Sequence, residues 1–220
     1  MSFLLLFKDE LRGFYKSKVM IFLWIGLPLM TVLLHLWSPD TGEDIPFTAL
    51  SAMIVSSVGG TLAAVMLTVS IINEKTRHVY DLFLIRPLKR WTLIISKYFA
   101  VYTCITIASF LALILGLAID YFSMGGTPEA VLNDTGQSLA ISLSMMAVSS
   151  SVGVLIGVAA PSVLVGAILV IYGGNQISAI PMLPNMLNIP NPVPFTIILG
   201  AVISCILLII AAFLFTRKQF

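Results

Sequence analysis

The sequence has 220 residues, of which 59% are hydrophobic and only 10% are charged, and its mean hydropathy is +1.04. A soluble domain carries about 25% charged residues, and a chain of this size cannot bury so much apolar surface against itself. The composition therefore excludes a soluble globular protein and, with it, a nucleic-acid-binding protein. We expect one membrane domain that occupies residues 1–220.

Six apolar segments are long enough to cross a bilayer as helices. A helix needs about 20 apolar residues to span a hydrocarbon core about 30 Å thick. The predicted spans are residues 19–37, 48–72, 98–119, 138–160, 162–180 and 196–215. Their apolar runs are continuous, whereas the strands of a membrane barrel alternate. The predicted fold is thus an all-α polytopic membrane protein with six transmembrane helices, in which residues 159–162 form a tight hairpin between the fourth and fifth spans.

The charged residues divide sharply between the two sides that six spans define. The side that holds both termini has all twelve Lys and Arg residues and four acidic ones, a net charge of +8. The other side has six acidic residues and no basic one, a net charge of −6. Because basic loops stay in the cytoplasm, this distribution predicts a multi-pass protein of the cell (inner or plasma) membrane with both termini cytoplasmic.

The N-terminal residues 1–18 have the pattern of an amphipathic helix. Their apolar side chains recur at helical spacing at Leu4, Phe7, Leu11 and Phe14. Charged residues occupy the other side of the same helix. A helix of this kind lies in the interface plane with its apolar face in the bilayer, so we expect it to precede the first span.

The six predicted spans contain no Asp, Glu, Lys or Arg. Ion-coupled transporters usually need charged groups at membrane depth, although backbone carbonyls can also bind sodium. Cys104 and Cys205 each fall inside a predicted span and lack the spacing of metal ligands. We therefore predict no catalytic, cofactor-binding or metal site in this chain, and no enzymatic activity of its own.

Small residues recur at helical spacing in two spans. The second span has Ala52, Ser56, Gly60, Ala64 and Thr68, and the fourth has Ser149, Gly153 and Gly157. Stripes of small residues let helix backbones approach closely in lipid. We favour packing within the chain over a dimer interface as their explanation.

The fifth span contains two amides, Asn175 and Gln176, directly after Gly173 and Gly174. The glycines predict local flexibility, and polar groups at membrane depth mark candidate substrate pathways. A hydrogen bond to a neighbouring helix explains the two amides equally well.

The longest inner loop, residues 73–97, combines charged and apolar side chains. Residues 73–86 predict a helix that continues from the second span and ends before Pro87. A second short helix is expected around Trp91–Tyr98, with Lys97 marking the entry into the membrane. Because Tyr80 and Phe83 share a face of the first helix, the loop suits docking to a soluble partner.

This loop resembles a segment of type-2 ABC transporter permeases, the membrane subunits of ABC exporters. In that family an acidic residue precedes a second acid, an apolar run, a proline and a later lysine. The residues that match are Glu74, Asp81, Leu82–Ile85, Pro87 and Lys97. The chain departs from the family at 78–80, where His-Val-Tyr stands in place of the more frequent Gly-Thr-Leu. An N-terminal elbow helix, six spans and a Pro-rich outer segment before the last span complete the resemblance.

The resemblance implies a permease that works as a homodimer or as a heterodimer with a second permease. Its loop 73–97 would form a cytoplasmic coupling helix that binds a separate ABC ATPase subunit, which holds ATP and magnesium. The residues expected to bind this partner are Glu74, Arg77, His78, Tyr80, Asp81, Leu82, Phe83 and Pro87. Among them, Tyr80, Leu82 and Phe83 would be anchors, and Glu74, Arg77 and Asp81 would be charges at the rim.

ATP must bind elsewhere, because these 220 residues contain no Gly-x-x-x-x-Gly-Lys-Ser/Thr loop. Membrane lipids are the other expected partner. Two further functions stay open on the sequence alone: a secondary carrier or channel without an ATPase, and a membrane scaffold that recruits a cytosolic protein through residues 73–97.

Overall fold

The computed structural model describes residues 3–37, 47–77, 90–124, 129–187 and 192–217, and within these ranges the regular structure is entirely helical. The long helices are α1 (Phe3–Tyr15), α2 (Lys18–Trp37), α3 (Phe47–Thr76), α5 (Arg90–Met124), α6 (Glu129–Ala159) and α10 (Pro192–Arg217). Between α6 and α10 lie α7 (Val163–Leu169), the π-helix η1 (Val170–Gly174), α8 (Asn175–Ser178), the 3-10 turn η2 (Ile180–Met182) and α9 (Leu183–Met186).

Five stretches among the described residues are long and apolar enough to cross a membrane. They are Ala52–Thr76, Trp91–Ile119, Thr135–Ala159, Val163–Met182 and Pro192–Arg217. The consecutive helices α1 and α2 are bent by 67° and bring the number to six if the pair is taken as one span. A helical polytopic membrane protein, as the apolar segments predict, is confirmed to this extent.

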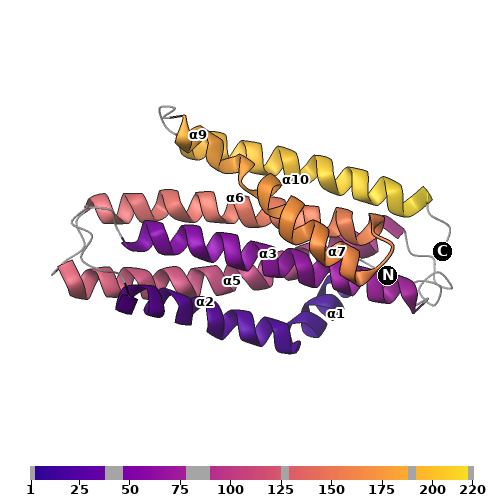
Figure 1. Ribbon diagram of the computed structural model, residues 1–220, viewed down its shortest axis with the longest axis horizontal. Helices are drawn as coiled ribbons and strands as arrows, with labels where there is room; N and C mark the ends of the chain where they lie inside the picture. The colour runs from indigo at the N-terminus through magenta and orange to yellow at the C-terminus, as the bar shows by residue number, and fades with distance from the viewer. Residues whose placement is uncertain (1–2, 38–46, 78–89, 125–128, 188–191, 218–220) are drawn as a thin grey trace.

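Helices α2, α3, α5 and α6 run in alternating directions along the length of the molecule (Figure 1). The short helices α7–α9 run back, and α10 then lies beside α6 and runs in the same direction as α6. The helix α1 and the C-terminal ends of α3 and α10 all lie toward the right-hand end of this view. The last turns of these helices carry Arg12, Lys75 and Arg217. The fold therefore gathers basic residues at one end, in agreement with the division of charge along the sequence. The orientation of this end in a membrane stays a prediction.

The two stripes of small residues pack against each other at the contact between α3 and α6. A methyl group added at Gly153 would lie 2.6 Å from the Cα and O atoms of Ala64, which is closer than two heavy atoms can approach. The Thr68 hydroxyl donates a 2.7 Å hydrogen bond to the Gly153 carbonyl. The prediction of packing within the chain is confirmed, because these faces are already occupied. A second close approach joins α6 to α10, where a methyl group at Gly200 would lie 2.8 Å from Ser144 Cβ.

Helix α5 is fastened to its neighbours by hydrogen bonds that cross between helices. The indole of Trp24 in α2 donates to the carbonyl of Cys104 at 3.2 Å. The hydroxyls of Tyr98 and Tyr102 donate to backbone carbonyls of α6 at 3.3 and 3.4 Å. Because lipid offers these groups no partner, such bonds help to specify which helices are adjacent.

One predicted boundary agrees with the structure and two differ. The hairpin at 159–162 is confirmed: α6 ends at Ala159, and Ser162 caps α7 by accepting from the Val165 N–H. The expected short helix near Trp91 is not separate, because α5 continues without a break from Arg90. Helix α3 extends beyond the predicted span but ends at Thr76, and Arg77 lies in a turn. The remainder of the predicted loop helix, residues 78–86, falls outside the described residues.

Candidate functional site

The buried face of α1 contains a carboxylate. Leu6 and Phe14 are buried, and Glu10 lies between them at four-residue spacing, with 21% of its side chain exposed. Leu4, on the apolar face predicted from the sequence, is 72% exposed, as a side chain that faces lipid would be. Glu10 points into the protein, and the orientation of α1 relative to a bilayer stays a prediction.

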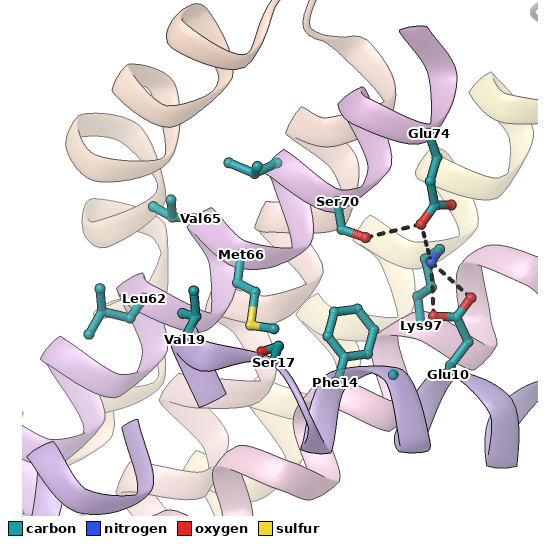
Figure 2. A pocket seen from close by; sticks show the side chains of 12 residues that line it. Glu10, Phe14, Ser17, Val19, Leu62, Val65, Met66, Ser70, Glu74 and Lys97 are labelled. Carbon is teal, nitrogen blue, oxygen red and sulfur yellow. Dashed lines mark hydrogen bonds and ion pairs between the residues drawn. The ribbon is translucent and has the colours of Figure 1, made fainter. Parts of the chain in front are cut away.

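The partner of Glu10 is Lys97, a buried lysine in α5 (Figure 2). Only 4% of the Lys97 side chain is exposed, and its Nζ lies 2.8 Å from Glu10 Oε1 and 2.6 Å from Glu74 Oε1. The Ser70 hydroxyl donates to the same Glu74 oxygen at 3.1 Å. One ammonium group thus connects α1, α3 and α5. We call Glu10, Glu74 and Lys97 together the ion-pair cluster.

The charges of the ion-pair cluster do not balance, because two carboxylates face one ammonium group. Burial raises the pKa of Glu10 above its usual range, while the attraction of Lys97 opposes this and the neighbouring Glu74 and Asp9 add to it. The Lys97 ammonium also lies 5.6 Å from the centre of the Phe14 ring, within range of a cation–π interaction.

A buried charge is tolerated only when it is paired and hydrogen-bonded. Removing one partner of a buried pair leaves an uncompensated charge and costs about 3–5 kcal/mol. The ion-pair cluster therefore holds three helices in one arrangement, and α1 cannot move relative to α3 and α5 without separating these charges. Because Glu74 is near the end of α3 and Lys97 is near the start of α5, the cluster also joins the two ends of the intervening segment.

A cavity of about 470 Å³ adjoins the ion-pair cluster. Figure 2 shows the cluster at one end of this cavity, with Phe14 and the side chains of α3 along the rest of its wall. The apolar part of the wall comes from Phe14, Val19, Leu62, Val65, Met66 and Val69. The site thus combines a charged end with an apolar chamber, within the size range of small-molecule pockets.

Of the residues predicted to bind a partner, the structure describes two. Glu74 belongs to the ion-pair cluster, with 25% of its side chain exposed, and its role in binding a partner stays a prediction. Arg77 is exposed in the turn after α3, and its backbone N–H donates to the Asn73 carbonyl at 3.0 Å. The other predicted residues, His78, Tyr80, Asp81, Leu82, Phe83 and Pro87, lie outside the described residues.

The predicted pathway residues Asn175 and Gln176 are exposed on α8, directly after the π-helix η1. Neither amide side chain forms a hydrogen bond to another described residue, so the interhelical hydrogen bond that the sequence left open is absent from this part of the chain. A methyl group at Gly173 would meet no atom within 4 Å. The role of Asn175 and Gln176 in a substrate pathway stays a prediction.

Sequence reasoning missed Glu10 as a site residue and placed Lys97 only as a marker of the membrane entry. A signal for Glu10 was present, because it lies four residues from both Leu6 and Phe14. A carboxylate on that side of an amphipathic helix requires a cation when the helix docks. No group of three or more potential metal ligands occurs among the described residues.

No protein-family model matches the chain, and no curated protein or solved structure is significantly similar to it. The fold and the site therefore define the class, a helical polytopic membrane protein with a buried ion-pair cluster near one end of its helices.

Proposed function

We propose that the chain is the membrane-spanning permease subunit of an ATP-driven ABC exporter, that it forms the translocation pathway as a dimer, and that a separate ATPase subunit drives it. The observation that supports this proposal is the contact between Lys97 and Glu74. These two residues are the first and last matched positions of the segment that resembles the family's coupling loop, and their contact closes the base of that segment.

A closed base suits the transmission of force. ATP-driven closure of the ATPase subunits would push on the segment between Glu74 and Lys97. The two ends of this segment, Glu74 and Lys97, contact each other, and Lys97 also contacts Glu10 of α1. A displacement of the segment would therefore move α1, α3 and α5 together. The spans would then exchange between two packed arrangements, as in other transitions driven by a shift of population.

The partner-binding residues divide into two groups in this proposal. Tyr80, Leu82 and Phe83 are the anchors that fill a groove of the ATPase, and Arg77 and Asp81 are charges at the rim. Glu74, whose carboxylate is bound to Lys97, contributes at the base of the segment by holding it together.

The test is purification of the tagged chain from its native membranes in mild detergent. We expect a stoichiometric partner that carries a phosphate-binding loop and hydrolyses ATP, and we expect Tyr80→Ala/Phe83→Ala to lose it. The matched control is Tyr121→Ala/Phe122→Ala, an aromatic pair that is exposed near the opposite end of α5 and should keep the partner.

The remaining outcomes separate the alternatives. Transport by the isolated chain in liposomes without ATP would replace the proposal with a carrier or channel. A stoichiometric partner without ATPase activity would identify a scaffold. Within the proposal, Asp81→Lys should reduce ATP-driven transport while membrane insertion is unchanged, and unaltered transport in that variant would remove Asp81 from the coupling role.

A further inference from the structure

The cavity beside the ion-pair cluster has two chemically distinct ends. Glu10, Glu74 and Lys97 line one end, and the rest of the wall is largely apolar. A ligand that fills this cavity of about 470 Å³ must therefore have a polar head and an apolar body. Figure 2 shows Leu62, Val65 and Met66 on the side of the cavity away from the charged end.

The charge at the polar end decides which head fits. Lys97 is already hydrogen-bonded to Glu10 and Glu74, so its ammonium is committed to the two carboxylates. Glu74 Oε1 accepts from Lys97 and Ser70, whereas Glu74 Oε2 accepts from no described residue. A carboxylate oxygen without a donor and a net negative charge favour a head that donates hydrogen bonds and carries positive charge.

We propose that this cavity binds an amphiphile with a primary ammonium head, placed at the carboxylates of Glu74 and Glu10, with its apolar chain along Phe14, Val65 and Val69. The face of the Phe14 ring is an additional attraction for the cation. An anionic head would meet two carboxylates, and a neutral alcohol would leave the excess negative charge uncompensated.

This chemistry has two possible sources, an amine-headed membrane lipid such as phosphatidylethanolamine and a soluble amphiphilic amine. Both place the same ammonium group at the same carboxylates, so the site is defined by the head. The inference does not rest on the proposed ABC function, because it concerns binding by this chain alone and requires neither ATP nor an ATPase.

The experiment measures binding to the purified full-length chain in detergent by native mass spectrometry, with thermal stability as the second readout. The probes are dodecylamine, dodecanol and dodecanoic acid, which share one chain length and differ in the head. We expect dodecylamine to bind about tenfold or more tightly than the other two, in keeping with a hydrogen bond to a charged group. Equal binding of all three probes would overturn the proposal.

Two variants locate the site. Glu74→Gln keeps the shape of the side chain and the Lys97–Glu10 pair, and should weaken dodecylamine binding about tenfold. Val69→Phe should abolish binding because its ring fills the chamber. The matched control is Val202→Phe on the outward face of α10, where the native side chain is 50% exposed and binding should be unchanged. Wild-type affinity in both cavity variants would place the amine elsewhere and overturn the assignment.

The two sources are then separated with lipid. Bound phosphatidylethanolamine, retained through purification in preference to phosphatidylcholine and lost in Val69→Phe, identifies a lipid site. Binding of dodecylamine to the lipid-stripped chain without binding of dioleoylphosphatidylethanolamine identifies a soluble amine. Failure of both ammonium compounds to bind contradicts the proposal.

Discussion

The Lys97 ammonium of α5 and the Glu10 carboxylate of α1 form a 2.8 Å ion pair across 87 positions of sequence. A helix that the sequence would place flat on the membrane surface is thereby anchored to the first turns of a spanning helix. The ring contact between Phe3 and Phe99, with centroids 6.2 Å apart, supports the same docking. These contacts make α1 an integral part of the helix assembly.

Removing the shared cation should destabilise the fold. Lys97→Met leaves Glu10 and Glu74 side by side without a counter-charge, so we expect a loss of about 3–5 kcal/mol in the free energy of unfolding. The measurement is thermal unfolding of the detergent-solubilised chain, monitored by the loss of the folded peak in size-exclusion chromatography. Lys16→Met, at an exposed position between α1 and α2, is the control and should unfold like the wild type. Equal stability of both variants would show that the ion-pair cluster does not hold the helices together.

Stability should depend on pH through Glu10. Burial raises its pKa above the usual 4.5, so the folded protein holds this proton more tightly than the unfolded chain does. The contribution of Glu10 is therefore fully present below pH 4.5 and is lost as the pH rises through its folded-state pKa. We expect the wild type to gain stability relative to Glu10→Gln as the pH falls from neutral towards 4.5. The opposite slope would mean that attraction to Lys97 outweighs burial.

The contact between α3 and α6 should not tolerate a methyl group. Gly153→Ala would place a carbon 2.6 Å from the Ala64 backbone, and we expect it to cost about 1–3 kcal/mol through overpacking. Gly136→Ala in the same helix is the matched control, because nothing lies within 4 Å of its added carbon. That control should be neutral or stabilising, by up to about 1 kcal/mol. Thermal unfolding of the two variants gives the comparison.

The hydrogen bond from Thr68 to Gly153 can be tested separately from packing. Thr68→Val keeps the shape and removes the 2.7 Å interhelical bond, and we expect a loss of about 0.6–2 kcal/mol. Thr103→Val removes only a bond within α5, from its hydroxyl to the Phe99 carbonyl. A smaller loss is expected there, and an equal loss in both variants would contradict a specific role for the interhelical bond.

The orientation in the membrane is the fifth prediction. Because the six predicted spans would place all twelve basic residues on the side of the termini, a green fluorescent protein fused after Phe220 should fluoresce in intact cells. Alkaline phosphatase inserted between the end of α5 at Met124 and the start of α6 at Glu129 should be active. Active phosphatase at the C-terminus would reverse the proposed topology.

The features of the fold that the sequence predicted correctly are those that a single segment of the chain specifies. The apolar runs correspond to the described helices, and the turn at 159–162 lies where Pro161 interrupts the chain. Small residues at four-residue spacing indicated a close helix contact, which Gly153 and Ala64 make. The expected separate helix before Lys97 was wrong, because α5 continues from Arg90 through this residue. Two carboxylates from other helices allow α5 to bury the Lys97 ammonium.

By itself, the sequence determined that the chain is a helical membrane protein, because the thickness of the hydrocarbon core sets the length of each apolar segment. The side of each basic residue stays a prediction from the positive-inside bias. Only the tertiary structure decided which face of α1 is buried and which groups neutralise Lys97. The physical reason is that a buried cation is stable only where carboxylates converge on it. That convergence depends on the packing of α1, α3 and α5, and no single segment specifies it.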